Sequence, residues 1–301
     1  MEVWIPITIA AAFFQNVRTA LQKHMSKSLS TGGATYIRFL YALPFAYLYV
    51  IGLHEVGDFP YYAPNWTFGG YVVVGGLAQI MATALLVKLF SLRNFAVGTT
   101  YSKTETVQAA FIGLVLLGDT LTIPAILAII ISFMGIILIS VSGNKITLKE
   151  VVLGWTGKPA LYGLSSGAFF GICAVSYRGA GLSLGGEGAV MQAATAIVWV
   201  LTFQATTMTA YIFLRERAQL MLSLKAWRMA VLVGLFSMLG SIGWFTAMTL
   251  QNAAYVRAVG QIELIFTFSI SYFIFRERTT LFEALGVLLI AVGILFLVLP
   301  W

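Results

Sequence analysis

The sequence predicts an all-α membrane protein in which ten transmembrane helices form two inverted five-helix repeats around a central cavity. Composition is the first reason: of 301 residues, 59% are hydrophobic and only 10% are charged, whereas a soluble domain carries about 25% charged residues. Length is the second reason, because the apolar segments reach the roughly 20 residues that a bilayer-spanning helix needs. The third is an internal repeat, since residues of the first half recur in the second half at a fixed offset.

Five apolar segments of the first half have the length of spanning helices. The first contains several polar residues, and the fifth is almost wholly apolar. The second contains Pro44, which removes a backbone donor and predicts a bend. In chain order we expect these spans at Val3–Gln22, Ala34–Leu53, Phe68–Phe90, Phe95–Leu117 and Leu121–Val141. They make up a first repeat over residues 1–144, which a connecting loop, residues 145–158, follows.

The second repeat, residues 159–301, contains five further spans. Pro159 suits the first turn of the opening helix, where the missing N–H group is not needed. The last span carries a single carboxylate, Glu283, at its edge. The expected spans are Pro159–Tyr177, Ala189–Phe213, Ala226–Met248, Ala253–Phe275 and Leu281–Leu299. Connections between spans are short, so consecutive helices run antiparallel.

The two halves match at an offset of 158 residues (263 − 105), which relates Glu105 to Glu263. Other matches are Asn94 with Asn252, Ala96 with Ala254, Thr122 with Thr280 and Gly135 with Gly293. Five helices per half is an odd number, so the second half must enter the membrane in the opposite sense. Inverted repeats of this kind are typical of secondary transporters, which bind their substrate between the repeats.

The distribution of loop cations predicts the orientation in the membrane. Connections after even-numbered spans hold Arg178 and little else. Because cytoplasmic loops carry an excess of Lys and Arg, we expect the cation-rich loops in the cytoplasm and both termini on the extracytoplasmic side. The cation-rich loops follow the odd-numbered spans and hold Lys23, Lys27, Arg93, Lys145, Lys149, Lys158, Arg215, Arg217, Lys225, Arg228, Arg276 and Arg278.

Glu105 and Glu263 lie inside apolar spans, where a charged side chain costs about 2.5–3.5 kcal/mol on insertion scales. Such residues are usually functional in membrane proteins. Lys103 is two residues from Glu105 and points about 200° away on a continuous helix. Glu105 must therefore pair with another helix or hold a proton, and we expect both carboxylates to serve as proton-coupling groups. The alternative is a structural ion pair with Arg18 or Arg38.

Other polar residues in the spans are candidates for a substrate site. Gln15, Arg18 and Gln22 share one helical face at spacings of three and four, as do Tyr101, Glu105 and Gln108. In the span Ala189–Phe213, a continuous polar stripe contains Gln192, Thr195, Trp199, Thr202 and Thr206. For the amides the alternative is hydrogen bonding between helices, and for the arginines it is snorkelling to the interface. The full set of predicted substrate-binding residues is Gln15, Arg18, Gln22, Arg38, Gln79, Tyr101, Glu105, Gln108, Tyr177, Gln192, Trp199, Trp244, Arg257, Gln261 and Glu263.

Several chemistries are not expected from this sequence. It contains no Gly-rich phosphate loop followed by Lys and Ser or Thr, so we expect no ATP-driven motor. The two histidines, His24 and His54, are far apart, and no His/Cys metal cluster or Ser–His–Asp set is apparent. The net charge of +7 resides in loops, which argues against a nucleic-acid partner. We therefore expect neither an enzyme nor a cofactor; the partners are a small-molecule substrate and the lipid bilayer, in a monomer or homodimer.

The closing helix pair of each half carries the clearest resemblance to a known family. The segments are LLGDTLTIPAILAIIISFMGIILISV, within Phe111–Val141, and FRERTTLFEALGVLLIAVGILFLVL, within Thr267–Leu299. With the five-plus-five repeat, they resemble EamA-type ten-helix members of the drug/metabolite transporter superfamily. Where that family usually has Gly-Glu, this chain has Gly118-Asp119 and Arg276-Glu277.

The resemblance implies a basket of helices with alternating access and, in bacteria, an inner-membrane location. The first to fourth and sixth to ninth helices would line its cavity, while the fifth and tenth stand apart. It also implies transport of amino acids, related metabolites or drugs. Many members have cytoplasmic termini, whereas the loop cations of this chain predict the opposite.

The balance of buried charge favours an acidic or zwitterionic substrate. Arg18, Arg38, Lys88, Lys103 and Arg257 lie within or near the spans, against two deep carboxylates. An Arg fork binds a carboxylate well, so we expect a small zwitterionic or anionic organic metabolite, such as an amino acid. The alternative is a multidrug exporter of lipophilic cations, for which Trp199 and Trp244 would provide stacking surfaces.

Overall fold

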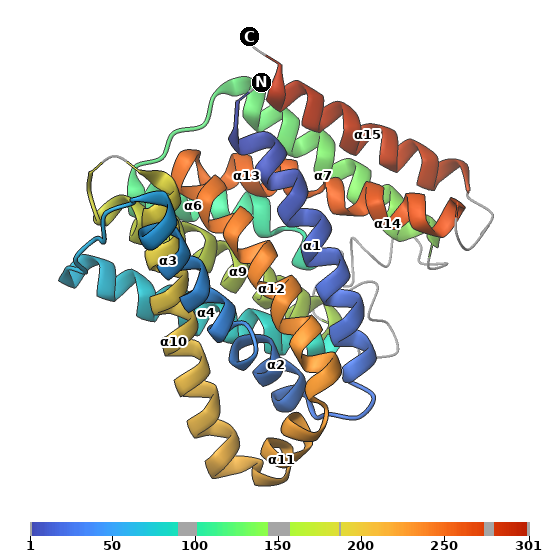
Figure 1. Cartoon of the computed structure of the whole chain (residues 1–301). Helices are drawn as coiled ribbons and strands as arrows, with labels where there is room; N and C mark the ends of the chain where they lie inside the picture. The colour runs from blue at the N-terminus through green and yellow to red at the C-terminus, as the bar shows by residue number, and fades with distance from the viewer. Residues whose placement is uncertain (1, 90–100, 144–156, 187, 274–279, 300–301) are drawn as a thin grey trace.

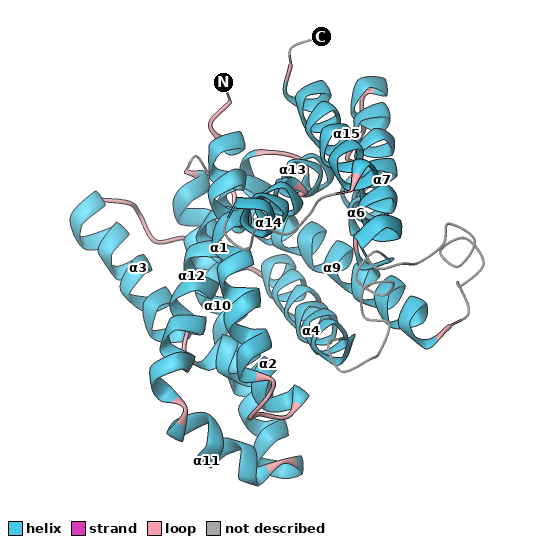
Figure 2. Cartoon of the chain, turned by 90° about the vertical axis from the view of Figure 1, so that its right-hand side faces the viewer, coloured by secondary structure: helices cyan, strands magenta, loops and turns pink. Residues whose placement is uncertain are grey.

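The computed structural model describes residues 2–89, 101–143, 157–186, 188–273 and 280–299. Every regular element within these residues is a helix, and none of them is in a strand (Figure 2). Five helical segments are long and apolar enough to cross a membrane by length and composition: Thr31–Gly57, Trp66–Leu89, Ala160–Ser183, Ala189–Arg215 and Trp227–Leu250. The all-α membrane fold predicted from the sequence is confirmed.

The described helices are compatible with the ten predicted spans. In the first half they are α1 (Trp4–Met25), α2 (Thr31–Leu40), α3 (Leu43–Gly57), α4 (Trp66–Leu89), α6 (Glu105–Leu117) and α7 (Ile123–Gly143). In the second half they are α9 (Lys158–Ser183), α10 (Ala189–Arg215), α11 (Arg217–Lys225), α12 (Trp227–Leu250), α13 (Ala253–Gly260), α14 (Ile262–Phe273) and α15 (Leu281–Val298). The start of the fourth predicted span, residues 95–100, lies outside the described residues.

Three of the predicted spans are interrupted. The second divides into α2 and α3 just before Pro44, which lies in the first turn of α3, where its missing N–H costs nothing. The ninth divides into α13 and α14 at Gln261. In the fourth, a turn at Lys103 and Thr104 precedes α6. Lys103 and Gln261 are related by the repeat offset of 158 residues (261 − 103), so the two halves are interrupted at matching positions.

The helices of the two halves pack against one another. The closest pairings are α7 with α15, α4 with α9, α1 with α12, and α6 with α9 (Figure 1). Helices α7 and α15 run side by side at one edge of the molecule in both views, which agrees with the expectation that the fifth and tenth spans stand apart. Helix α1 begins and α15 ends at the same end of the molecule. A chain with an even number of membrane-spanning segments, such as the ten predicted here, has both termini on one side. The short helix α11, which was not predicted from the sequence, lies at the opposite end.

The α7–α15 contact depends on two glycines that the repeat relates. A Cβ atom on Gly293 would lie 2.2 Å from the Ser132 Oγ and 2.8 Å from the Ala128 carbonyl oxygen. A Cβ atom on Gly135 would lie 2.5 Å from the Gly286 carbonyl oxygen. Small residues at membrane helix crossings let backbones approach closely, and here they do so symmetrically.

We expect Gly293→Val to destabilise the protein by about 1–3 kcal/mol, the range observed for overpacked interiors. The backbone carbonyl of Ala128 cannot move aside as a side chain can, so the two helices must separate. The matched control is Gly52→Val in α3, because nothing lies within 4 Å of a Cβ at that position. Thermal unfolding in detergent checks the difference; equal melting temperatures for the two variants would contradict it.

Candidate functional site

The helix interruptions place both buried carboxylates at helix N-termini. Glu105 is the first residue of α6, and Glu263 lies in the first turn of α14. Arg257 lies in the last turn of α13. The partial positive charge of a helix N-terminus favours an acidic group and the partial negative charge of a C-terminus favours a basic one. The interruptions therefore stabilise charges at this depth that a continuous helix would not.

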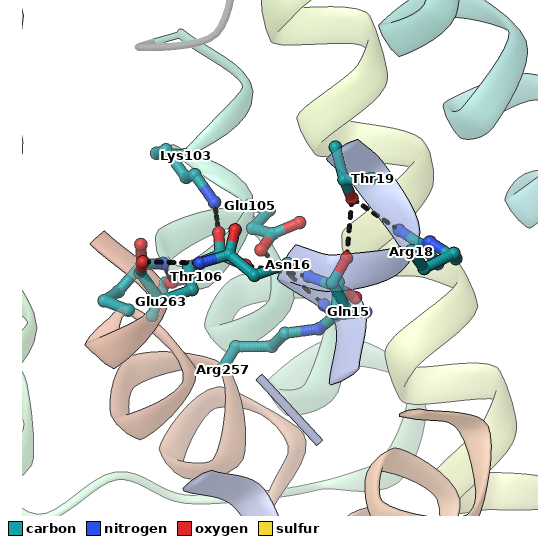
Figure 3. Close-up of polar contacts among 10 residues, drawn as sticks. Gln15, Asn16, Arg18, Thr19, Lys103, Glu105, Thr106, Arg257 and Glu263 are labelled. Carbon is teal, nitrogen blue, oxygen red and sulfur yellow. Dashed lines mark hydrogen bonds and ion pairs between the residues drawn. The ribbon is translucent and has the colours of Figure 1, made fainter. Parts of the chain in front are cut away.

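These charges form two ion pairs that cross between the halves (Figure 3). Arg257 Nη1 in the second half lies 3.6 Å from Glu105 Oε1 in the first half. Lys103 in the first half pairs with Glu263 in the second half. Both glutamates are buried residues, 8% and 9% exposed. The partner of Glu105 is thus Arg257, and not Arg18 or Arg38, which were the alternatives considered from the sequence.

Glu263 is held more firmly than Glu105. Gln15 Nε2 in α1 donates a 3.0 Å hydrogen bond to Glu263 Oε2, and Asn16 Nδ2 donates a 2.9 Å bond to the Glu263 carbonyl oxygen. Within the described part of the chain, Arg257 is the one group within ion-pair or hydrogen-bond distance of the Glu105 carboxylate. The two equivalent acids therefore occupy different environments.

Two adjoining cavities open around these pairs. Including space that is open to solvent, the smaller spans about 410 Å³ and the larger about 730 Å³. Both are lined by Gln15, Arg18, Phe170 and Arg257, so they meet at these side chains. The smaller is also lined by Arg38, Gln79, Tyr177, Phe236, Ser237, Gly240, Ser241, Trp244, Phe245 and Met248. The larger is also lined by Asn16, Thr19, Leu86, Ser102, Lys103, Glu105, Glu263 and Leu264.

The smaller cavity carries an excess of positive charge. Arg18 and Arg38 are 6% and 5% exposed, and neither forms an ion pair with a carboxylate of the described residues. Arg18 Nη2 donates to the Thr19 hydroxyl at 3.2 Å, and Arg38 Nη1 donates to the Thr83 hydroxyl at 2.5 Å. A buried charge without a counter-ion is costly, so this cavity favours an anion.

Several buried polar atoms around the smaller cavity have no hydrogen-bond partner within the described structure. They are the Nε atoms of Arg18 and Arg257, the indole Nε1 of Trp244 and the hydroxyl of Ser237. The three nitrogen atoms can only donate hydrogen bonds. An unpaired buried donor costs about 1–3 kcal/mol, so acceptor oxygens brought next to these nitrogen atoms would be stabilised.

Two aromatic rings are in contact with Arg257. Its guanidinium carbon lies 4.9 Å from the Trp244 ring centroid and 5.8 Å from the Phe170 ring centroid. Cation–π contacts of this length stabilise a desolvated guanidinium. The ring faces are thereby occupied by a cation of the protein itself.

A hydrogen-bonded amide network borders the smaller cavity. The Tyr177 hydroxyl donates to Gln79 Oε1 at 2.9 Å, and Gln204 Nε2 donates to the same oxygen at 2.8 Å. The Tyr177 ring stacks on Phe245 with centroids 4.1 Å apart. Gln204 was not among the predicted site residues, because it lies off the polar stripe of its helix.

We expect Tyr177→Phe to lower the free energy of unfolding by about 1 kcal/mol, the usual contribution of one hydrogen bond. The stacking on Phe245 would remain, and Gln79 Oε1 would still accept from Gln204. Thermal unfolding checks this, with Tyr162→Phe on the same helix as the control. A loss as large as that of Tyr177→Ala would mean that the hydroxyl contributes more than its contacts with Gly75, Gln79 and Gln204.

Six predicted site residues lie away from both cavities. Three of them bond to the protein: Gln22 Nε2 to the Ala34 carbonyl oxygen at 2.7 Å, Gln261 Nε2 to the Thr106 hydroxyl at 3.0 Å, and Gln192 Nε2 to the carbonyl oxygens of Gly185 and Gly186. Gln108 donates to Thr104, and Tyr101 lies before the turn that precedes α6. Because of that turn, Tyr101, Glu105 and Gln108 do not form the single helical face expected from their spacing.

Trp199 is the sixth. It is 50% exposed and meets Phe68 edge-on, on the outward face of α10 with Thr206. The inward face of α10 instead carries Ile197 and Met208 with several alanines. Threonine hydroxyls in α10 bond to their own backbone, as Thr202 does to the Val198 carbonyl at 2.7 Å. Such bonds satisfy the hydroxyl hydrogen within the helix, so threonines in this stripe do not by themselves mark the cavity.

Comparison with known proteins is consistent with this architecture. The profile of the EamA-like transporter family matches residues 2–141 and 158–299, once in each half. One similar solved structure, described as "Crystal structure of protein", is 13% identical, and the alignment covers 98% of this chain and 96% of that one with a TM-score of 0.70. At this identity the likeness concerns the fold alone. A search of curated proteins finds no match.

Proposed function

The chain belongs to the EamA-like transporter family, and on that premise we propose that it carries a small zwitterionic or anionic organic metabolite, amino-acid-like in size, across the membrane by alternating access. The membrane-transporter assignment follows from the family. The substrate class rests on the charges of the cavities.

One observation carries the substrate class: Arg18 and Arg38 are buried at the smaller cavity without a carboxylate partner in the described structure. The Glu105–Arg257 and Lys103–Glu263 pairs are each neutral, so they leave the two guanidinium groups uncompensated. Guanidinium groups bind carboxylates with two parallel hydrogen bonds. A substrate carboxylate at this position would offset the cost of burying these charges.

The same charges argue against the multidrug alternative. A lipophilic cation needs carboxylates or free aromatic faces, whereas the rings of Phe170 and Trp244 contact Arg257. Trp199 lies on the outside of α10, half exposed. Like charges at close range cost several kcal/mol, so a cation would enter this cavity only against repulsion.

The remaining parts of the proposal concern topology. Residues 1–144 and 159–301 act as the two repeats, joined by residues 145–158. The protein resides in the inner membrane with both termini extracytoplasmic, as the loop cations favour. Labelling of single cysteines at Glu2 and Lys225 with a membrane-impermeant reagent tests the orientation: we expect labelling at position 2 from outside the cell and none at position 225.

Glu105 and Glu263 serve as the proton-coupling groups in this proposal. We expect Glu105→Gln to remove the dependence of uptake on a proton gradient while substrate binding persists, because an amide cannot titrate. The single contact of Glu105 makes it the easier of the two carboxylates to release from its pair. Uptake into proteoliposomes with and without a protonophore checks this; unchanged coupling in the variant would remove Glu105 from the mechanism.

Transport itself is tested with the purified protein in proteoliposomes and a mixed pool of amino acids and organic acids. We expect saturable uptake of a carboxylate-bearing compound with counterflow, which distinguishes a carrier from a channel. Stabilisation by quaternary ammonium compounds alone in a thermal-shift screen would contradict the proposal.

A further inference from the structure

The smaller cavity contains more positive charge than a zwitterion or a single carboxylate can balance. Arg18, Arg38 and Arg257 all line it, and they come from three different helices, α1, α2 and α13. Like charges that line one cavity repel one another. The one described carboxylate that pairs with any of them is Glu105, which pairs with Arg257. Two positive charges therefore remain.

From this juxtaposition we infer that the transported metabolite carries two carboxylates, and that Arg38 binds the second of them. This inference rests on the proposed function and narrows its substrate class. The first carboxylate lies at Arg18 and Arg257, where the two cavities meet. The second lies at Arg38, beside Gln79 and Tyr177.

The unpaired donors support an anion with many acceptor oxygens. Arg18 Nε, Arg257 Nε and Trp244 Nε1 have no partner in the described structure, and all three residues are more than nine-tenths buried. Two carboxylates offer four oxygen atoms and about eight acceptor positions. A single carboxylate offers half as many and leaves one of the guanidinium groups without a counter-ion.

Arg38 is placed to act on the substrate and not on the lipid interface. It is 5% exposed and lines the smaller cavity, which removes the snorkelling alternative. It lies in the last turn of α2, where the helix C-terminus favours a cation. Its one described hydrogen bond is to a neutral hydroxyl, that of Thr83. A carboxylate can therefore bind without displacing an ion pair of the protein.

Glu105 makes room for an amino group as well. It lines the larger cavity, next to the Arg257 side chain that both cavities share. An acidic amino acid would place its two carboxylates on the arginines, and its ammonium group would share Glu105 with Arg257. Dicarboxylates with and without an ammonium group are thus both within the inferred class.

The experiment compares isosteres that differ by one charge. Succinate is matched with succinamate, and glutamate with glutamine, in competition for uptake or in thermal shift of the purified full-length protein. We expect each doubly carboxylated compound to bind at least about ten-fold more tightly than its amide, the usual effect of losing one charge-assisted contact. Glycerol phosphate serves as a third arm that distinguishes a doubly charged phosphate group from a dicarboxylate.

Arg38→Gln should reduce the ratio of the two affinities, acid over amide, to about one. Without the Arg38 guanidinium group, the second carboxylate has no cation to bind and gains nothing over the amide. Arg38→Lys should retain most of the preference for the acid, which keeps the test valid if the glutamine variant fails to fold. The matched control is Arg228→Gln, an exposed arginine at the start of α12, and it should leave the preference unchanged.

The outcomes separate the inference from the proposed function. If the wild-type protein binds acids and amides equally, or if Arg38→Lys loses the preference as fully as Arg38→Gln does, the inference is overturned while transport of a carboxylate-bearing metabolite stands. Preference for glycerol phosphate over every dicarboxylate would also overturn it. If the wild-type protein responds to none of these anions, the proposed function fails and the inference fails with it.

Discussion

Arg257→Ala is expected to abolish transport and to destabilise the protein. The variant leaves Glu105 buried without its partner, and breaking a buried ion pair in this way costs about 3–5 kcal/mol. It also removes the guanidinium group that lies between the two cavities. We expect at least about 100-fold slower uptake in proteoliposomes, in line with the loss of one member of a buried charged contact.

A double variant separates the two effects of Arg257. Arg257→Met combined with Glu105→Gln removes both charges, so we expect most of the thermal stability to return. Transport should remain absent, because the double variant still lacks the Arg257 guanidinium group that binds the substrate carboxylate. If the double variant transports as well as the wild-type protein, Arg257 has a structural role alone, and the substrate assignment would have to rest on Arg18 and Arg38.

Lys103→Met is expected to have the second largest effect, and mainly on stability. Glu263 would then keep the hydrogen bond from Gln15 but lose its cation. We expect a loss of about 3–5 kcal/mol, seen as a lower unfolding temperature and a smaller folded fraction in detergent.

Charge reversal is the control for this pair. Lys103→Glu combined with Glu263→Lys should recover a large part of the stability that Lys103→Met loses, since the attraction between the two positions is restored. If the single variants Lys103→Glu and Glu263→Lys were each as stable as the wild-type protein, this pair would contribute nothing to the stability of the fold.

Much of the fold was predictable from the sequence because lipid imposes simple rules. The length and apolarity of segments such as Trp66–Leu89 predict a spanning helix, and the described helices agree with those positions. Pro44 predicted a bend, and the break between α2 and α3 confirms one at that place. The break at Gln261 is not marked by proline; it follows Gly260, the last residue of α13.

The candidate site was less predictable from the sequence. Tyr101, Glu105 and Gln108 share one face only on a continuous helix, and the turn at Lys103 and Thr104 interrupts it. The sequence indicated that Glu105 needs a partner on another helix, but identifying Arg257 required the packing of α6 against α13. Likewise, the polar stripe of α10 does not follow one cavity-facing side: Trp199 is half exposed, Thr195 is buried, and Thr195 and Thr202 bond to their own backbone.

The crossed ion pairs also constrain how this protein can diverge. Each acid is neutralised by a base from the opposite half, so each half on its own would contain a buried acid and a buried base without their partners. A chimera that joins the amino-terminal half of this chain to the carboxy-terminal half of a relative would need a base opposite Glu105 and an acid opposite Lys103. Substitutions at Glu105 or Lys103 are therefore expected to coevolve with partners more than 150 residues away in the sequence.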